Sequence, residues 1–411
     1  MNDENRNTEL VNWFKKALGT EECTVELQGM KEKGDGYLAD INFAKITLNE
    51  TNKNSQELYL IAKVSRTAVD MRSFSEDLCK REVAFYAEIV PLMYQFQKEK
   101  SIERPFKALP KCYKAFETKE TEVIVQDNMV QKGYRLHNKR IPMNMNHIKL
   151  ALRNYAKFHA ISLALNDQRP EEFERIERNY TNLFLEKINL FEGMYKSTVE
   201  KVIGNLIEIG RSDLAKRYEK LMERGTCNIL IDLFNDLPKE RVITHADCHN
   251  GNLLFKYRDN EENNPTDMVM LDFQISCVFS PMIDLALFLY CGGSKVELDQ
   301  LEYILEYYHK ELSSFLSELG SDVEKLFPVS VMWEHWRKYA FHGFNGGTCI
   351  LELFFVETDD VPNFDDTSTW QDDGSGSGDQ KLFNIKVKNR EPYLERLRDI
   401  VEHYLNFNKI H

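Results

Sequence analysis

The chain has 411 residues, of which 42% are hydrophobic and 29% are charged, a composition typical of a folded globular protein. Asp and Glu number 66 against 53 Lys and Arg, and the net charge of −13 argues against a general nucleic-acid-binding protein, which needs clustered cations. A polar amino terminus, the lack of a long apolar run and eight cysteines without a C-x-x-C pair predict a cytoplasmic protein with reduced thiols and no membrane insertion.

The first part of the chain is predicted to be a strand-rich lobe interrupted by one helix. Residues 37–48 and 57–65 are apolar segments of strand-forming residues separated by a polar turn, which is the pattern of a β-hairpin. Residues 75–98 then carry apolar side chains at helical spacing. A short strand at 123–126 ends this part.

Helical patterns dominate the rest of the chain. They run through residues 151–165, 181–207, 212–234, 296–319 and 330–342. Short strands are predicted at 242–244, 252–257 and 267–273, the last two joined by a polar turn. Residues 357–380 are rich in acidic residues and contain GSGSG, which favours a flexible, solvated loop over an acidic lid or docking segment.

The stretch VITHADCHNGNLLF, residues 242–255, crowds polar side chains into a loop between two apolar runs. One interpretation is a zinc or di-metal hydrolase with His245, Asp247, Cys248 and His249 among the ligands. No second cluster supplies the remaining ligands, because the other histidines are scattered along the chain. The hydrolase is therefore the less favoured interpretation.

The other interpretation of this stretch is the catalytic loop of a phosphotransferase. Such an enzyme needs a carboxylate to orient the acceptor hydroxyl and oxygen ligands for a Mg²⁺ ion that binds the nucleotide phosphates. Asp247 is the candidate for the first task, and Asn252 and Asp272 are candidates for the second. The turn between the two predicted strands would bring Asn252 and Asp272 close together.

A lysine and two glycines in the first lobe are candidates for binding phosphate. Lys63 lies in the apolar strand YLIAKVS, where an unpaired cation is costly, and Glu82 on the following helix is its predicted partner. Lys63 could then reach the α- and β-phosphates, or it could be an ordinary surface lysine of a strand. Gly34 and Gly36 could let backbone amides approach phosphate, although ordinary turns also contain such pairs.

Asp284 is a candidate supporting residue behind the crowded loop. It lies one turn into a helix that Ser280 would cap and Pro281 would begin. A carboxylate there could stabilise only the helix dipole, or it could brace the loop. We favour the brace.

In this order along the chain, the motifs resemble the kinase-like phosphotransferases that include aminoglycoside phosphotransferases and choline kinases. The ecdysteroid 22-kinase-like branch, also called CHK-kinase-like, is the most similar. The matching segments are KGDGYLAD, IAKV, REVAFYAEIVP, VIVQDN, LRNYAKFHAISLAL, THADCHNGNLLF, MLDFQ and SPMIDLALFLY. The resemblance implies an α+β, two-lobed protein-kinase-like fold with a nucleotide-binding lobe at 1–127 and a catalytic, acceptor-binding lobe at 128–411.

The resemblance also implies roles for single residues. Lys63 would be the phosphate-binding lysine and Glu82 its partner. Asp247 would be the catalytic aspartate, Asn252 and Asp272 would be the Mg²⁺ ligands, and His245 and Asp284 would be supporting residues. Gln126 to Asn128 would form the interlobe linker, whose backbone binds adenine. The sequence departs from the family pattern at Ala246, where H-G-D is usual, in the linker VQDN, where L-E-D-L is usual, and in the glycine loop, where Gly36 replaces a common asparagine.

The activity that follows is Mg²⁺-dependent transfer of the γ-phosphoryl group of ATP to a hydroxyl of a small lipophilic acceptor such as an ecdysteroid or a xenobiotic alcohol. A protein substrate is disfavoured because no activation loop with A-P-E lies between Asp272 and Asp284. A non-catalytic pseudokinase and the metal hydrolase stay as alternatives, and the oligomeric state is open. The acceptor pocket or the core could contain the aromatic residues Trp333, Trp336, Tyr339, Phe341 and Phe344.

Overall fold

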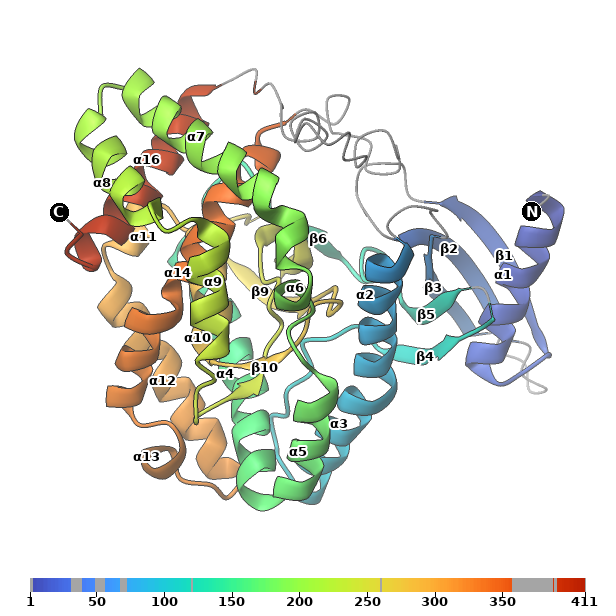
Figure 1. Cartoon of the computed structure of the whole chain (residues 1–411). Coiled ribbons are helices and arrows are strands. Elements are labelled where there is room, and N and C mark those ends of the chain that lie inside the picture. Colours follow the sequence, from blue (N-terminus) through green and yellow to red (C-terminus); the bar gives the residue numbers. More distant parts are fainter. Residues whose placement is uncertain are drawn as a thin grey trace.

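A computed structural model describes residues 3–30, 39–48, 56–66, 72–119, 121–258, 261–356, 387 and 390–410. Within them, a smaller lobe built on strands lies beside a larger lobe of helices (Figure 1). The predicted α+β fold, with a small β-rich lobe and a larger, mainly helical lobe, is confirmed. Gly34, Gly36 and the acidic segment 357–380 lie outside the described residues.

The N-terminal sheet is antiparallel and has the strand order β1-β2-β3-β5-β4. Its strands are β1 (Cys23–Met30), β2 (Ala39–Leu48), β3 (Gln56–Ser65), β4 (Cys112–Glu117) and β5 (Glu122–Asp127). The predicted pairing of the segments 37–48 and 57–65 is confirmed as β2 and β3. Lys63 on β3 pairs with Ile41 on β2 and with Ile124 on β5, so it lies in the middle of the sheet.

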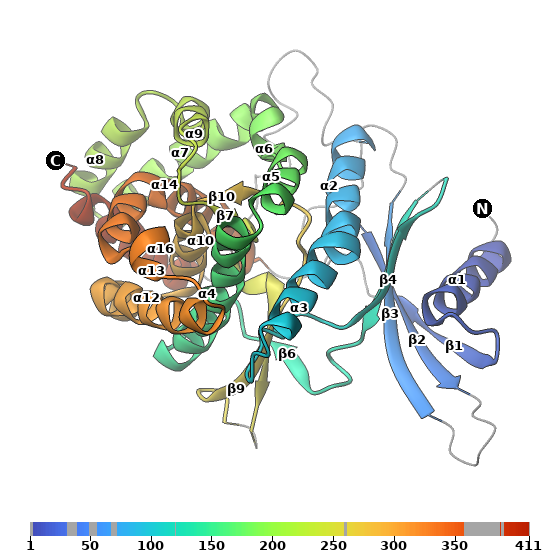
Figure 2. The ribbon, with the colours of Figure 1, turned by 90° about the horizontal axis from the view of Figure 1, so that it is seen from below.

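Helix α1 (Asp3–Leu18) covers the outer face of this sheet (Figure 2). Leu10 and Phe14 of α1 pack in one buried cluster with Ala62 and Val64 of β3. Because side chains alternate between the faces of a strand, Lys63 is directed to the opposite face. The strand pattern therefore turns the lysine toward the helical lobe.

One long helical segment lies on that opposite face, as predicted for residues 75–98. It consists of α2 (Arg72–Ala84), a π-helical turn (Phe85–Ile89) and α3 (Val90–Glu99). Phe85, Tyr86 and Ile89 are buried in the same hydrophobic core as the large lobe. The segment thus joins the sheet to the helical lobe.

The larger lobe contains most of the helices. They are α4 (Met145–Gln168), α5 (Pro170–Asn179), α6 (Leu183–Glu186), α7 (Glu192–Glu208), α8 (Ser212–Met222), α9 (Thr226–Asn235), α10 (Pro281–Gly292), α11 (Lys295–Leu298), α12 (Leu301–Glu318), α13 (Val323–Leu326), α14 (Val329–Phe354) and α16 (Arg390–Phe407), with a 3-10 turn at Ile188–Phe191. The predicted pattern at 212–234 is two helices, because Gly225 has a φ of 77° and interrupts it. None of the described helices combines the length and apolar composition that a membrane span requires.

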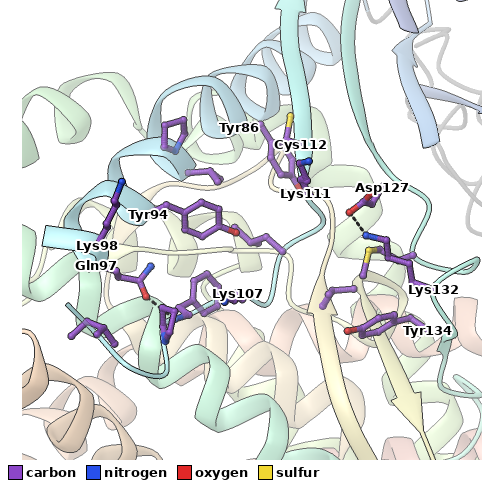
Figure 3. Close-up of a pocket in the computed structure, with 18 of the residues that line it drawn as sticks. Tyr86, Tyr94, Gln97, Lys98, Lys107, Lys111, Cys112, Asp127, Lys132 and Tyr134 are labelled. Atoms are coloured by element: carbon purple, nitrogen blue, oxygen red, sulfur yellow. Dashed lines mark hydrogen bonds and ion pairs between the residues drawn. The ribbon is translucent and has the colours of Figure 1, made fainter. Parts of the chain in front are cut away.

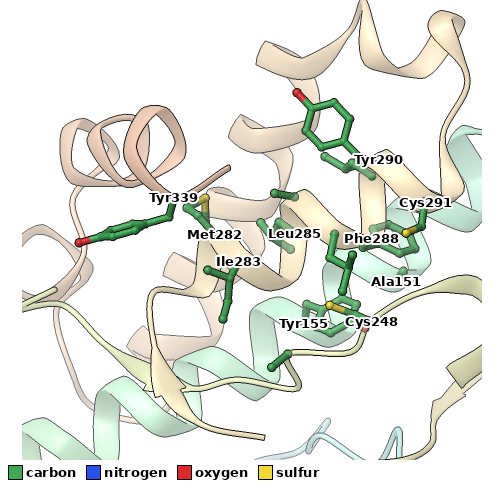
Figure 4. Packing of buried hydrophobic residues seen from close by; sticks show 14 of the residues in the cluster. Ala151, Tyr155, Cys248, Met282, Ile283, Leu285, Phe288, Tyr290, Cys291 and Tyr339 are labelled. Carbon is green, nitrogen blue, oxygen red and sulfur yellow. The ribbon is translucent and has the colours of Figure 1, made fainter. Parts of the chain in front are cut away.

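Helix α10 is the centre of the large lobe. Every residue from Pro281 to Gly292 is buried. Figure 4 shows side chains of α10 together with Ala151 and Tyr155 of α4 and Tyr339 of α14. α14 approaches α10 closely at Gly343, where a Cβ atom would lie 2.2 Å from backbone atoms of Ala286 and Leu287. A rigid, fully packed helix therefore carries Asp284.

Two small sheets flank the crowded loop. β7 (Val242–Ile243) pairs with β10 (Val278–Phe279), and β6 (Tyr134–Leu136), β8 (Leu253–Tyr257) and β9 (Pro265–Met270) form the second sheet. The predicted hairpin of residues 252–257 and 267–273 is confirmed as β8 and β9. The loop between β7 and β8, which includes the 3-10 turn Asn250–Asn252, carries Asp247.

Candidate active site

The loop after β7 is held by the carboxylate of Asp284, in the first turn of α10. Asp284 Oδ2 accepts a hydrogen bond from the backbone N–H of His245 at 2.8 Å, and Oδ1 accepts one from that of Ala246 at 2.8 Å. Ser280 caps α10 by accepting from Met282 N at 3.2 Å, as the sequence predicts. Asp284 thus contacts the loop from behind, in the predicted supporting position.

Two residues that the sequence did not single out complete this support. His159 Nε2 on α4 lies 3.1 Å from Asp284 Oδ2, and His159 Nδ1 lies 2.8 Å from the hydroxyl of Tyr308 on α12. All three side chains are fully buried. Burial alone would raise the pKa of Asp284, but the hydrogen bonds from His159 and the His245 backbone lower it, so the carboxylate is ionised.

His245 fixes the loop from inside. Its Nδ1 accepts the backbone N–H of Asp247 at 3.2 Å, and its Nε2 donates to the carbonyl of Leu271 at 2.8 Å. Both ring nitrogens are therefore occupied, which leaves His245 without a lone pair for zinc. Within the described part of the chain, no group of three or more His, Cys, Asp and Glu residues is arranged to hold a metal ion, and the hydrolase interpretation finds no support there.

Asp247 and Asn252 contact each other directly. Asn252 Nδ2 donates to the backbone carbonyl of Asp247 at 2.8 Å and to its Oδ2 at 2.9 Å. Both amide protons are thus used, and the Oδ1 atom of Asn252 remains as an acceptor or metal ligand. The side chain of Asp247 is 19% exposed, so a substrate can reach it.

The two neighbours of Asp247 in the loop have structural contacts. Cys248 is fully buried, and its thiol donates to the carbonyl of Asp284 at 3.0 Å. Ala246 has a φ of 64°, in the left-handed region where the family's usual glycine is free of strain. The methyl group of Ala246 is accommodated in this turn at the cost of some backbone strain.

The hairpin of β8 and β9 brings Asn252 and Asp272 together, as predicted. The backbone N–H of Leu271 donates to the carbonyl of Asn252 at 2.8 Å. Asp272 follows Leu271 directly, has a φ of 68° and is 27% exposed at its side chain. The two predicted Mg²⁺ ligands therefore lie at the same end of one hairpin.

Lys63 contacts two carboxylates, Glu82 of its own lobe and Asp272 of the larger lobe. Its Nζ lies 2.6 Å from Glu82 Oε2, which is the predicted pair, and 2.7 Å from Asp272 Oδ1. Burial would lower the pKa of Lys63, but attraction to Asp272 and Glu82 outweighs burial and raises it. Burial raises the pKa of Glu82 from its usual 4.5 to about 7, even beside Lys63.

Further contacts fix the helix that carries Glu82. The Phe85 ring stacks on Phe273, with ring centroids 3.9 Å apart and planes at 7°, and the Phe273 ring lies 4.3 Å from that of His245. Arg81 donates to the backbone carbonyls of Thr181 at 2.8 Å and Ser276 at 2.6 Å. The position of Glu82 is thus coupled to the large lobe.

The residue directly after the predicted adenine-binding linker, Met129, has a backbone donor that is unpaired among the described residues. The N–H of Asn128 donates to Tyr59 O at 2.9 Å, and the Asn128 side chain accepts from the amides of Val130 and Gln131. Neither the N–H of Met129 nor the buried Oε1 of Gln126 has a hydrogen-bond partner among the described residues. The adenine contact itself stays a prediction.

The aromatic residues of α14 belong to the core. Trp336, Tyr339, Phe341 and Phe344 are all buried, and Trp333 stacks on Phe407 with ring centroids 6.4 Å apart. The four buried side chains pack in the core cluster, so for them the core interpretation is confirmed. Trp333 is only half-buried and also lines a cavity with Arg337 and Phe407.

Three comparisons relate the chain to known proteins. No curated protein matches it. Similar solved structures include two GDP complexes of aminoglycoside 2′-phosphotransferase-IIIa. The mutant form has 11% identity and a TM-score of 0.44, and the match covers 98% of this chain and 99% of that chain. The wild-type form has 10% identity, a TM-score of 0.43 and coverage of 99% of this chain and 100% of that chain. The model of the ecdysteroid kinase-like family matches residues 33–321, so the chain belongs to this family.

Proposed function

We propose that the protein transfers the γ-phosphoryl group of ATP to a hydroxyl of a lipophilic small molecule. One observation carries the proposal: Lys63 of the small lobe meets Asp272 at 2.7 Å, at the hairpin end that also carries Asn252, which is bonded to Asp247. A phosphotransferase needs a phosphate-binding cation, metal-binding oxygens and a hydroxyl-orienting carboxylate in that order. The family assignment supports the same reaction class.

The nucleotide would lie between the two lobes. Lys63, held extended by Glu82, would bind the α- and β-phosphates. The N–H of Met129, directly after the predicted linker and unpaired among the described residues, would donate to adenine. Gly34 and Gly36, which lie outside the described residues, stay the predicted phosphate-binding glycines. When ATP enters, its phosphates would replace Asp272 as the second partner of Lys63.

The oxygen atoms left at the hairpin end fit Mg²⁺. Asn252 bonds Asp247 through Nδ2, and Asp272 contacts Lys63 through Oδ1, so Asn252 Oδ1 and Asp272 Oδ2 have no hydrogen-bond partner among the described residues. Two protein oxygens suit Mg²⁺, which usually keeps water and phosphate oxygens as its other ligands. Bound there, Mg²⁺ would neutralise the charge that develops on the phosphates.

Asp247 would orient the acceptor hydroxyl and accept its proton. Asn252 fixes Oδ2, and Oδ1 is left for the acceptor, with His249 Nε2 3.5 Å away. Burial lowers the pKa of His249, so this histidine is neutral and does not compensate the charge that Asp247 needs as a base. The choice of an ecdysteroid or xenobiotic alcohol as acceptor rests on the family, together with the apolar ring of Phe354, which lies 6.1 Å from that of His249.

Purified protein with ATP, Mg²⁺ and a panel of steroid and other lipophilic alcohols tests the proposal. Mass spectrometry should detect a phosphorylated alcohol, and Asp247→Asn should lower kcat by about 10²- to 10⁴-fold, with ATP affinity unchanged. Asp213→Asn, at a carboxylate on α8 that is 59% exposed, is the matched control and should behave as the parent.

Two results would contradict the proposal. Nucleotide binding without any phosphorylated product across the panel would favour the pseudokinase. An Asp247→Asn variant as active as the parent would remove Asp247 from the mechanism.

A further inference from the structure

A cavity lies beside the interlobe linker, with Asp127 and Met129 among its lining residues. It has a volume of about 1240 Å³ and lies between the π-helical turn and α3, the start of β4, the linker and the hairpin of β8 and β9 (Figure 3). Lys63, Asp247, Asn252 and Asp272 are not among the residues that line it. The proposed transfer reaction therefore does not account for this cavity.

The floor of the cavity is apolar. It is formed by side chains that are buried in the fold, namely Val90, Phe106, Leu109, Met129 and Val269. These residues come from α3, the segment before β4, the linker and β9, so both lobes contribute to the floor. Its size is sufficient for a drug-sized molecule, since ligand pockets commonly measure about 300–1,000 Å³.

The rim of the cavity is strongly basic, in contrast with the net charge of −13 of the chain. It contains five exposed lysines, Lys98, Lys107, Lys111, Lys132 and Lys256. Asp127 is the one carboxylate that lines the cavity, and it is paired with Lys132.

The other four lysines keep their charge available. Lys111 and Lys256 lie over the rings of Tyr113 and Tyr134, at 4.2 and 5.4 Å from the centroids, which does not neutralise them. Lys98 and Lys107 form no ion pair with any described residue. The lysines therefore favour a negatively charged ligand.

A buried hydroxyl gives a second, independent sign of a ligand. Tyr86 is 3% exposed and lines the cavity, and its Oη atom has no hydrogen-bond partner among the described residues. Burial raises the pKa of Tyr86, so the hydroxyl keeps its proton and can donate. An unpaired buried hydroxyl costs free energy that a ligand acceptor would recover.

We infer that this cavity binds a small amphipathic anion. Its apolar body would lie on the buried floor, and a carboxylate, phosphate or sulfate head would lie among the lysines. The cavity shares only the linker region, at Asp127 and Met129, with the proposed nucleotide site, and none of Lys63, Asp247, Asn252 and Asp272 lines it, so binding does not require the proposed activity.

Dodecyl phosphate, used below its micelle concentration with the full chain, tests the site by calorimetric titration. We expect saturable binding of one molecule per chain. Inorganic phosphate, which lacks the apolar chain, and dodecanol, which lacks the anionic head, should each bind at least about 10-fold more weakly. The double variant Lys98→Glu/Lys107→Glu should lose at least about 10-fold in affinity. Tyr86→Phe, which keeps the ring, should lose a few-fold.

The matched control is Lys216→Glu/Lys239→Glu, which makes the same change of charge at exposed positions outside the cavity. It should bind the probe as the parent does, and so should Asp247→Asn, so failure of the transfer reaction and failure of this site are distinguishable. Equal losses in both lysine double variants, displacement of the probe by ATP, or no saturable binding would overturn the inference.

Discussion

The support beneath the loop that carries Asp247 consists of three fully buried side chains, His159, Asp284 and Tyr308, whereas the link between the lobes includes a carboxylate that solvent reaches. We call the first set the loop brace and the second set, Lys63, Glu82 and Asp272, the interlobe link. The loop brace belongs to the large lobe alone and fixes Asp247 before any substrate binds. In the proposed reaction the interlobe link exchanges a partner when phosphates arrive, because Lys63 contacts the proposed metal ligand Asp272. In this proposal the rigid part of the site therefore lies at the acceptor side and the exchange of contacts at the nucleotide side.

The largest effect is expected from Asp284→Ala, which removes the centre of the loop brace. The change leaves His159 and the backbone N–H groups of His245 and Ala246 buried without an acceptor, and we expect a loss of about 3–5 kcal/mol in the free energy of unfolding. Activity should disappear together with stability. Urea unfolding measures this, with Asp213→Ala as the exposed control, and a loss below about 1 kcal/mol would show that the brace does not hold the loop.

Lys63→Met tests the interlobe link and should affect binding more than folding. We expect a loss of about 10- to 100-fold in ATP affinity, because a charge-assisted contact to phosphate is lost. Stability should fall less than in Asp284→Ala, because Glu82, with a pKa of about 7, can take up a proton when its partner is gone. The double variant Lys63→Met/Glu82→Gln should recover stability but not ATP affinity. A large fall in Tm with unchanged ATP affinity would contradict the proposed role of Lys63.

The pH dependence of stability should distinguish the link from the brace. Glu82 has a pKa of about 7 in the folded chain and 4.5 as its usual value, so the folded state binds the extra proton between these values. This contribution to stability is full below pH 4.5 and is lost as the pH rises through 7, amounting to about 2 kcal/mol between pH 5 and 7. Urea unfolding of the nucleotide-free protein should show a flatter profile over this interval in Glu82→Gln; the same slope in parent and variant would rule out Glu82 as the titrating group.

Ala246→Gly should give the smallest effect, and in the stabilising direction. A residue other than glycine with a φ of 64° is strained, and we expect glycine to raise the free energy of unfolding by up to about 1 kcal/mol. Thermal unfolding measures the change. A lower Tm would mean that the methyl group contributes more by packing than it costs in strain.

Local patterns predicted the parts of the site that are close in sequence. The cost of an unpaired cation in an apolar strand, with Glu82 on the helix that follows, predicted that Lys63 meets Glu82. The turn after β8 predicted that Asn252 meets Asp272. Cap residues Ser280 and Pro281 predicted the start of α10. These contacts follow from short-range periodicity and turn chemistry, which a single sequence carries.

The rest of the site depends on contacts between distant segments. His159 and Tyr308 are 149 residues apart, and only the packing of α12 on α4 and of α4 on α10 brings Tyr308 to His159 and His159 to Asp284. A histidine inside the apolar pattern of NYAKFHAISLAL was the one available signal. The packing of α1 on the sheet and the unpaired N–H of Met129 likewise depend on contacts between distant segments. Without those contacts, the aromatic residues of α14 could not be assigned to the core or to a pocket.

The π-helical turn Phe85–Ile89 sets the rotational phase between the two halves of the helix that carries Glu82. A π turn takes up more residues than the 3.6 of an α-helical turn, so α2 is rotated relative to an uninterrupted helix. Deleting one residue of the turn would restore regular α-helix and rotate α2 relative to α3 by about 100°. Glu82 would then leave Lys63, while Met93 and Phe96 could keep their places in the core. Helix length, as well as residue type, therefore selects the carboxylate that faces the lysine.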